Sequence, residues 1–233
     1  MFQLEIIMTE SLNIKLKNVF LKLQNIQIFK NLNFDFSSNG VSIILGANGS
    51  GKTLLTKAIV GLIDLDKGEV IKNETLEIGY APQKIVFLRR NVYENLAYPL
   101  KVKGENGQKI KKKINKLMDE FGVENKKFLS ARNLSAGNSQ YISFIRSIVA
   151  DPKILILDEP CSNLDDNFRI KVEDYIKKYQ KKKKIVMITH DFLQAKRLAD
   201  EIIIMRKGKF IGKYDKKHFI KNEKEVLKKF FSN

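Results

Sequence analysis

The sequence has a single cysteine, Cys161, no tryptophan and no long apolar run among its 233 residues. One cysteine excludes an internal disulfide, as is typical of proteins in a reducing compartment. Runs such as ILIL at 154–157 and IIIM at 202–205 have the length of strands, far below the roughly 18 to 20 apolar residues of a membrane-spanning helix. The opening MFQLEIIMTE lacks the basic start and the long apolar centre of a secretory signal. We therefore expect a soluble, cytosolic protein.

Acidic residues are also scarce, because 26 Asp and Glu stand against 43 Lys and Arg, a formal net charge of +17. Such an excess is typical of proteins that bind nucleic acid or anionic membranes, but a lysine-rich solvated surface also produces it. The lysines are spread over several segments, at 111–113, 181–184, 216–217 and 228–229, whereas a nucleic-acid footprint gathers on one face with aromatic residues. We favour the solvated surface and expect no nucleic-acid partner. A position beside the negatively charged cytoplasmic leaflet is compatible with this charge.

Apolar and polar residues alternate at 12–16 and again at 32–36, which predicts half-buried antiparallel strands near the N-terminus. The segment VSIIL at 41–45 is continuously apolar, as in a strand covered on both faces. Helical periodicity dominates from about 105 to 150, and the first helix there is predicted to end at Gly122.

The second half of the chain alternates between two kinds of pattern. Strands are predicted at 154–157, 185–189 and 201–206, helices near 166–179 and 191–199, and a basic amphipathic helix over 215–231. Alternating strands and helices favour parallel strands with right-handed crossovers. We predict an α/β fold: a mainly parallel sheet with flanking helices, an N-terminal antiparallel β part and an α-helical insert.

A glycine-rich segment, GANGSGKT, lies between the predicted strand 41–45 and a helical stretch, the context that a phosphate-binding loop requires. Glycines allow backbone conformations that side chains forbid, and the N–H groups then converge on phosphate at a helix N-terminus. Lys52 is predicted to reach the β- and γ-phosphates and Thr53 to bind Mg²⁺ through its hydroxyl. The predicted ATP-binding residues of this loop are Gly46, Ala47, Asn48, Gly49, Ser50, Gly51, Lys52 and Thr53.

Two acids end the buried strand ILILDEP at 154–160. Open α/β sheets bind ligands at the carboxyl ends of their strands, so Asp158 is placed to hold Mg²⁺ and Glu159 to meet a water aligned on the γ-phosphate. Without the upstream loop, the pair is equally explained as a strand end before a proline turn. His190 ends the strand MITH at the same edge, where it can contact the γ-phosphate and orient the base. Alone, a histidine there is more often structural.

These elements resemble the ATP-binding cassette (ABC) family over nearly the whole chain. The matching segments, in the family's order, are GANGSGKT (46–53), YAPQK with Gln83 (80–84), LSAGN (134–138), ILILDEP with SNLD (154–160, 162–165) and His190. The resemblance implies an ATPase that works as a homodimer with ATP and Mg²⁺. The signature that follows the helical insert separates this family from other phosphate-loop ATPases.

The resemblance also implies roles in trans. The signature residues Leu134, Ser135, Ala136, Gly137 and Asn138 would face the γ-phosphate of ATP held by the partner copy. Each ATP would then lie between two copies. Gln83 would contact Mg²⁺ or the attacking water, and Asp165 would couple the two sites across the dimer interface.

Four positions depart from the family pattern. Ala136 replaces a glycine, which is tolerable where φ stays negative, and Asn138 replaces a glutamine and shortens a contact. Cys161 stands where threonine or serine is common and is expected to be a small packed residue. Leu23 falls where an aromatic residue usually stacks on adenine, so the base would rest on an aliphatic side chain with weaker base selectivity.

The resemblance divides the single domain 1–233 into a catalytic core, about 1–85 and 150–233, and a helical and signature subdomain, about 86–149.

The run VFLRRNVYENLAYPLKVKG at 86–104 resembles oxyanion importers, especially tungstate systems, as does the segment at 189–209. Generic importer similarity, as in phosphate or amino-acid importers, is the alternative. The implied partners are integral-membrane permease subunits and a periplasmic or extracellular solute-binding protein. The implied location is the cytoplasmic face of the cell membrane.

Two other functions remain open. An ATPase of translation or nucleic-acid metabolism can carry the same cassette, but such proteins usually have two cassettes or a long coiled-coil insert. A non-hydrolysing, nucleotide-gated module is disfavoured because Glu159, His190 and Gln83 are all present. An exporter ATPase is a further alternative.

Overall fold

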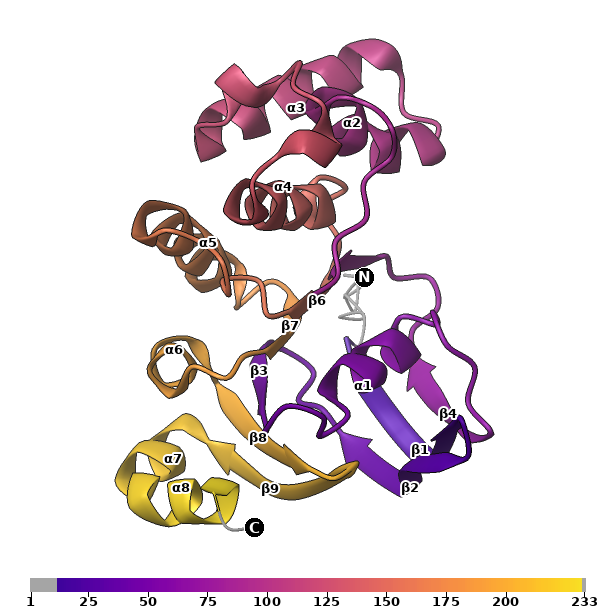
Figure 1. The fold of residues 1–233 in the computed structure, drawn as a ribbon, viewed down its shortest axis with the longest axis vertical. Helices are drawn as coiled ribbons and strands as arrows, with labels where there is room; N and C mark the ends of the chain where they lie inside the picture. Colours follow the sequence, from indigo (N-terminus) through magenta and orange to yellow (C-terminus); the bar gives the residue numbers. More distant parts are fainter. Residues whose placement is uncertain (1–11, 232–233) are drawn as a thin grey trace, which may run out of the picture.

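Two β-sheets form the framework of the computed structural model, which describes residues 12–231 (Figure 1). The opening segment interpreted above as lacking a signal lies outside the described residues. The smaller sheet is antiparallel, in the order β2 (Ile26–Asp35), β1 (Ile14–Leu23), β4 (Lys67–Lys72). The larger sheet has the order β5 (Ile78–Ala81), β6 (Ile154–Asp158), β7 (Lys184–Ile188), β3 (Gly40–Leu45), β8 (Glu201–Arg206), β9 (Lys209–Asp215). Its first five strands are parallel and β9 is antiparallel to β8.

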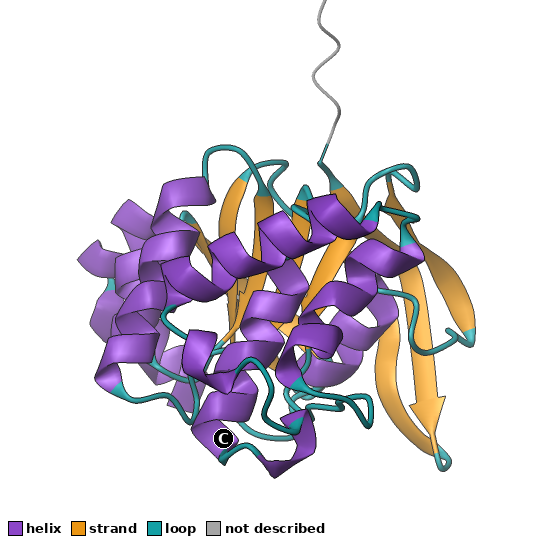
Figure 2. Cartoon of the chain, turned by 90° about the horizontal axis from the view of Figure 1, so that it is seen from above, coloured by secondary structure: helices purple, strands orange, loops and turns teal. Residues whose placement is uncertain are grey.

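Helices cover both faces of the larger sheet (Figure 2). The helices are α1 (Lys52–Ile59), α2 (Val92–Val102), α3 (Gly107–Phe121), α4 (Ala136–Ile148), α5 (Asp166–Tyr179), α6 (Phe192–Leu198), α7 (Lys216–Lys221) and α8 (Glu223–Phe231). One apolar cluster joins α1 to both sheets, and the other joins the opposite face of the large sheet to α2 through α8. Every residue of β3, β6 and β7 is therefore buried, which confirms the covering on both faces predicted for 41–45 and the burial predicted for the strand at 154–160.

The alternation in the N-terminal strands changes phase, which the sequence pattern did not reveal. Leu16 is buried before Asn18, whereas Val19 and Leu21 are buried after it. Asn18 has φ 50°, and the pairing with β2 and β4 shifts register there. A β-bulge of this kind inserts one residue and exchanges the two faces of the strand. Gly68 of β4 fits against the bulge, because an added Cβ would lie 2.1 Å from the carbonyl oxygen of Asn18.

The C-terminal prediction of one helix over 215–231 is wrong. Asp215 ends β9 and caps α7, since its Oδ1 accepts a hydrogen bond of 2.8 Å from the N–H of His218. Asn222 leaves the helical conformation and α8 begins at Glu223. Two short helices therefore replace the long one. No helix within the described part of the chain is long and apolar enough to span a membrane.

The helical region also begins earlier than the periodicity from about 105 indicated. The side chain of Asn91 accepts a hydrogen bond of 2.8 Å from the N–H of Glu94 and so starts α2 at Val92. Pro99 lies inside α2, and a proline within a pattern weakens the helical signal because it lacks an N–H. The Asn cap is the sequence feature that could have located this helix.

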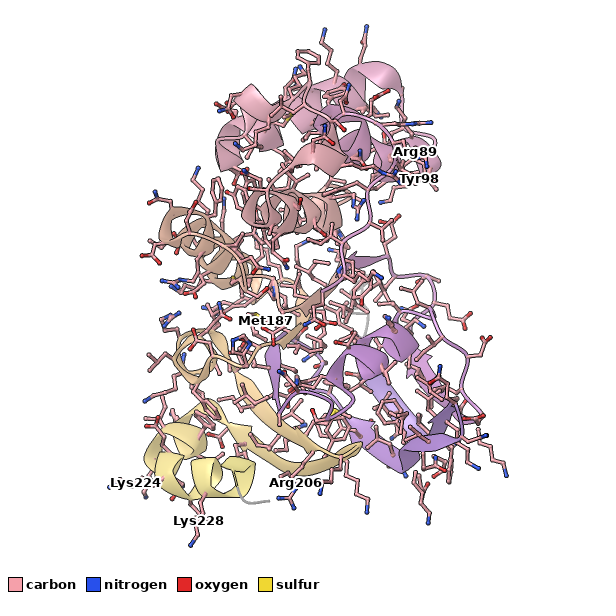
Figure 3. The ribbon with its side chains drawn as sticks, in the orientation of Figure 1. Arg89, Tyr98, Met187, Arg206, Lys224 and Lys228 are labelled. Atoms are coloured by element: carbon pink, nitrogen blue, oxygen red, sulfur yellow. The ribbon has the colours of Figure 1, made fainter. Side chains whose placement is uncertain are left out.

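The lysine run at 181–184 is not uniformly solvated, contrary to the interpretation of the charge. Lys183 is buried and its Nζ donates to Asp151 Oδ1 and the Pro152 carbonyl oxygen, both at 2.6 Å. Lys184 is fully buried, and its Nζ lies 3.6 Å from Glu201 Oε1. Lys52 is also buried. The other lysines whose side chains the structure describes are exposed or half-buried, as are Lys224 and Lys228 in Figure 3, so the solvated-surface interpretation holds for them.

Both charged groups of the buried Lys184–Glu201 pair have further polar partners. The hydroxyl of Ser42 lies between the two charged groups and hydrogen-bonds both. The N–H of Ser37 donates to Glu201 Oε1 at 3.0 Å, and Lys213 Nζ lies 2.9 Å from Oε2. Burial alone would raise the pKa of Glu201, but these hydrogen bonds outweigh it and hold the pKa well below its usual range. The pair joins β3, β7 and β8 at the edge opposite the ligand-binding edge.

Glu201→Gln is expected to lower the free energy of unfolding at pH 7 by about 3 kcal/mol or more, because it leaves Lys184 buried without its charge partner. Urea denaturation measures this loss. Asp35→Asn, which removes one member of the exposed Lys15–Asp35 pair, is the control and should cost about 1 kcal/mol or less.

The loss of unfolding free energy caused by Glu201→Gln should become smaller at acidic pH. The pKa of Glu201 is lowered in the folded state from an ordinary 4.5, so its stabilisation is present above that value and is lost as the pH falls below it. The difference between wild type and Glu201→Gln should therefore shrink once the pH falls below 4.5. A difference that grows below that pH, or one no larger than that of Asp35→Asn at pH 7, would contradict this account of the pair.

Candidate active site

The phosphate loop joins the end of β3 to the start of α1, at the carboxyl edge of the parallel strands. Gly49 and Gly51 have φ values of 76° and 101°, which only glycine adopts without strain. Gly46 has no such φ and is needed for another reason, because an added Cβ would lie 2.4 Å from the carbonyl oxygen of Met205. Gly51 occupies the N-cap of α1 and no side chain caps it, so the N–H groups of the first turn face the loop.

Lys52 is held across the mouth of the loop. Its Nζ donates hydrogen bonds of 2.7 Å to the carbonyl oxygen of Gly46 and 2.9 Å to that of Ala47. Burial lowers the pKa of the Lys52 ammonium, while the carboxylates of Glu159 and Asp158 act to raise it. Because an ammonium has three donors and two are in use, a third is free to meet a phosphate oxygen.

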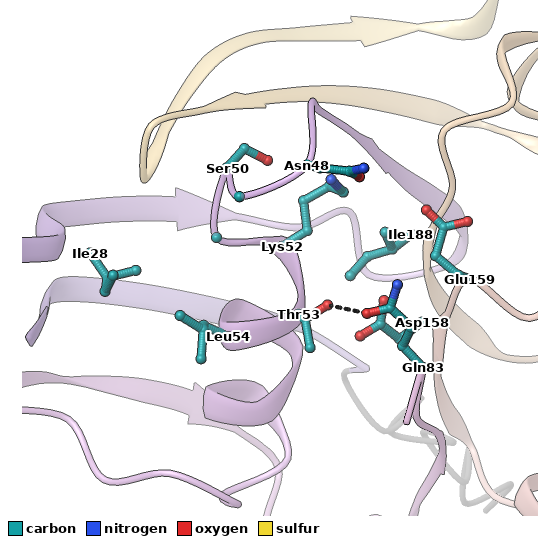
Figure 4. A pocket seen from close by; sticks show the side chains of 12 residues that line it. Ile28, Asn48, Ser50, Lys52, Thr53, Leu54, Gln83, Asp158, Glu159 and Ile188 are labelled. Carbon is teal, nitrogen blue, oxygen red and sulfur yellow. Dashed lines mark hydrogen bonds between the residues drawn. The ribbon is translucent and has the colours of Figure 1, made fainter. Parts of the chain in front are cut away.

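Asp158 ends β6 beneath the loop (Figure 4). Its side chain is fully buried, and neither carboxylate oxygen has a hydrogen-bond partner among the described residues. Burial raises the pKa of Asp158 to about 6. Thr53 Oγ1 donates to Gln83 Oε1 at 3.5 Å, so a hydroxyl and an amide oxygen border the same space.

Such a site is chemically suited to a divalent cation. A buried carboxylate without partners is costly unless something compensates its charge. Oxygen ligands from a carboxylate, a hydroxyl and an amide are those that Mg²⁺ prefers, usually completed by water and nucleotide phosphate. Asp158, Thr53 and Gln83 therefore fit the magnesium site that the sequence predicted. They are the residues that would hold the ion.

Glu159 follows in a left-handed conformation, with φ 54°. Its N–H donates to the carbonyl oxygen of Ile188 at 3.1 Å, and its own carbonyl accepts from Gln140 Nε2 at 2.9 Å. These bonds hold a conformation that costs on the order of 1 kcal/mol for a non-glycine residue. Gln140 is buried and was missed from the sequence, where only its position shortly after the signature could have pointed to it.

The side chain of Glu159 contacts His190, as the shared strand edge predicted. His190 Nδ1 lies 2.9 and 3.0 Å from the two carboxylate oxygens of Glu159. The Glu159 side chain is almost fully buried, whereas that of His190 is 67% exposed. A buried carboxylate oriented by an imidazole, beside a phosphate loop, has the geometry of a general base for an attacking water.

The phosphate loop, Gln83, Asp158 and Glu159 line one cavity of about 320 Å³. Lys52, Asp158 and Glu159 lie at its polar end, and the aliphatic side chains of Ile28 and Leu54 at the other (Figure 4). Ile28 and Leu54 were not identified from the sequence. Leu23 does not line the cavity; it ends β1 with 40% exposure, so its contact with a base stays a prediction.

The signature residues lie elsewhere, at the N-terminus of α4. None of residues 134–138 lines the phosphate-loop cavity of the same chain. Ser135 caps α4: its Oγ accepts hydrogen bonds from the N–H of Asn138 at 3.4 Å and from the Asn138 amide nitrogen at 2.9 Å. Since Ser135 is exposed and both lone pairs are in use, its own proton is free to be donated outward.

The departures from the family pattern have structural explanations. Ala136 begins α4 and is not among the residues with positive φ. Its methyl group is therefore tolerated, because the backbone there keeps the negative φ that alanine needs. Gly137 cannot be larger, because an added Cβ would lie 2.6 Å from the carbonyl oxygen of Asn163. Burial raises the pKa of the Cys161 thiol to about 12, so it is a packed and unreactive residue. Asp165 caps α5 by accepting a hydrogen bond of 2.9 Å from the N–H of Phe168, and its coupling role stays a prediction.

Comparison with known proteins gives one family. The family model described as ABC transporter matches residues 29–162. A solved structure described as the ATP-binding subunit of an ABC transporter has a TM-score of 0.81 at 20% identity and covers 94% of this chain and 95% of its own. At that identity the likeness concerns the fold alone, and it agrees with the predicted α/β class.

Relatives of closer sequence are named for importers. A tungstate uptake system ATP-binding protein of Peptoclostridium acidaminophilum is 35% identical over 189 residues, which cover 77% of this chain and 87% of that protein. A molybdate/tungstate import ATP-binding protein of Pyrococcus abyssi is 30% identical, and the alignment covers 83% of this chain but only 60% of that longer protein. Relatives named for sulfate/thiosulfate and spermidine/putrescine import, from Mesostigma viride and Clostridium novyi, reach 30% and 33% identity.

Proposed function

Because this chain belongs to the ABC transporter family of ATP-binding proteins, we propose that it hydrolyses ATP in a dimer and couples that cycle to uptake through separate permease subunits. The observation that carries the proposal is the separation of two halves of a site. The phosphate loop, Asp158 and Glu159 line one cavity, and His190 contacts Glu159 from beside it. The signature serine at the start of α4 instead faces solvent. Two copies arranged head to tail would bring these halves together.

The chain's own groups account for the chemistry of hydrolysis. The N–H groups of the loop and the ammonium of Lys52 bind the β- and γ-phosphates. Bound Mg²⁺ would neutralise phosphate charge. Glu159 accepts the proton of the attacking water, and His190 fixes the direction of the Glu159 carboxylate. The hydroxyl of Ser135 of the partner copy donates a hydrogen bond to the γ-phosphate, and Asp165 lies on the segment that would sense the partner.

The proposed division places the catalytic core at about 1–85 and 150–233 and the helical and signature subdomain at about 86–149. A groove with a volume of about 540 Å³ lies where the two parts meet. Its lining includes Tyr80, Val86, Leu88, Tyr98, Pro99, Val102 and Arg146. Val86 and Val102 are 66% and 70% exposed, and Arg89 and Tyr98 project from the same end of the molecule (Figure 3).

Exposed apolar side chains in a groove are typical of a surface that binds another protein. We assign this groove to a helix of the permease, which would place the chain on the cytoplasmic face of the membrane. Its position beside the segment after Gln83 would connect permease movement with the magnesium site.

For the substrate we propose tungstate or a related oxyanion. The support is the tungstate uptake relative at 35% identity and the run at 86–104. The solute-binding protein and the permease would select the transported oxyanion. In this proposal no residue of this chain contacts that substrate.

The test is ATP turnover of the assembled transporter in proteoliposomes, with each candidate solute supplied to its binding protein. We expect a several-fold rise in turnover with tungstate and a smaller one or none with sulfate or spermidine. A rise only with spermidine would overturn the substrate while leaving the ATPase proposal intact. Turnover indifferent to the permease and to every solute would overturn the transport function.

A further inference from the structure

Helices α5 and α6 each begin directly after a catalytic segment and pack against each other. The chain passes from Glu159 through residues 160–165 into α5, and from His190 into α6, whose N-cap is Asp191. The hydrogen bond from the Glu159 N–H to the Ile188 carbonyl oxygen fixes the backbones of this pair, and α5 and α6 hold the segments that follow it.

A buried carboxylate joins the two helices. Glu173 of α5 is 5% exposed and accepts bidentate hydrogen bonds from Arg197 of α6, Nε to Oε2 at 3.0 Å and a terminal nitrogen to Oε1 at 2.7 Å. Gln194 Nε2, one turn earlier on α6, donates to the same Oε1 at 3.1 Å. Burial acts to raise the pKa of Glu173, yet the hydrogen bonds from Arg197 and Gln194 outweigh it and leave the pKa below its usual value.

The same cluster reaches the catalytic residues. The side chain of Gln194 also lies near Cys161, two residues after Glu159. Cys161, Gln194, Glu159 and His190 all line a small cavity of about 170 Å³. A hydrogen bond thus links Glu173 of α5 to Gln194, which lies beside the Glu159–His190 pair at the same small cavity.

We propose that Glu173 is a positioning residue for ATP hydrolysis, which fixes α6 against α5 so that His190 holds the Glu159 carboxylate in its working direction. The inference rests on the proposed hydrolytic function. Glu173 lines neither the phosphate-loop cavity nor the small cavity beside Glu159, and it acts only through Gln194, Arg197 and the His190 turn. A small displacement of a catalytic pair is enough to slow a reaction greatly.

Glu173→Gln is expected to lower kcat on the order of tenfold. The KM for ATP should stay nearly unchanged, because Glu173, Gln194 and Arg197 do not line the phosphate-loop cavity. Turnover is divided by the measured number of nucleotide-binding sites, so that unfolded protein does not lower the value of kcat. Asp174→Asn, on the same helix but exposed and paired only with Lys177, is the matched control and should retain wild-type kcat.

A double-mutant cycle separates positioning from general damage. If Glu173 acts through His190, adding Glu173→Gln to His190→Ala should cause no further loss of kcat, whereas structural damage would multiply the two losses. Unchanged kcat in Glu173→Gln, a parallel loss of ATP affinity, or multiplied losses would overturn the positioning role while the proposed function stands. Wild-type protein without ATP turnover would remove the proposed function and this inference with it.

Discussion

Glu159→Gln is expected to reduce ATP turnover by a factor on the order of 10² or more while leaving ATP binding intact. The substitution keeps the size of the side chain and its hydrogen bond to His190, but an amide cannot take the proton of the attacking water. ATP should consequently be trapped, and ATP-dependent dimers should accumulate.

Steady-state turnover and size-exclusion chromatography with ATP measure the two effects of Glu159→Gln. Asp166→Asn is the control, since it removes a nearby carboxylate that is exposed and paired only with Arg169, and it should hydrolyse ATP normally. Turnover of Glu159→Gln at the wild-type rate would remove Glu159 as the base.

Ser135→Arg is expected to abolish turnover although the substituted residue lies outside the phosphate-loop cavity of its own chain. The arginine would replace the hydroxyl that donates to the partner's γ-phosphate and would fill the space of the closed dimer. The helix itself should survive, because loss of an N-cap costs only about 1 kcal/mol. Nucleotide binding to the isolated copy should persist, since Lys52 and the loop are untouched.

Fluorescent-nucleotide binding and turnover, compared in the same preparation, check the Ser135 prediction. Asn133→Arg adds the same charge at an exposed residue two positions earlier and serves as the control. Wild-type turnover in Ser135→Arg, or equal inactivation by both substitutions, would argue against a specific role of the signature serine.

Local features of the sequence predicted which residues lie together at the candidate site. The strand–loop–helix order around 46–53 predicted the loop between β3 and α1, and the ends of the predicted strands 154–157 and 185–189 predicted Asp158, Glu159 and His190 at one edge. This succeeds because parallel strands carry their terminal residues to a common edge. The reason for Gly46 was wrong, however, since its close neighbour Met205 is distant in sequence.

Other features depend on packing that no local pattern records. The bulge at Asn18 changes the buried face only because β4 and β2 pair there. The Glu173–Arg197 pair joins residues 24 positions apart on two helices, and Lys184 appears solvent-exposed in sequence because its partner Glu201 lies on another strand. The split between α7 and α8 was missed because the amphipathic pattern continues across Asn222.

Mixing two inactive variants tests the shared site most directly. Ser135→Arg keeps an intact phosphate loop, and Lys52→Ala keeps an intact signature, so a head-to-tail dimer of the two contains one complete site. Titrating one variant into the other should therefore produce ATP turnover that neither shows alone, with a maximum at equal amounts. A mixture that stays inactive at every ratio, although both variants fold and associate, would contradict the arrangement in which each copy completes the other's site.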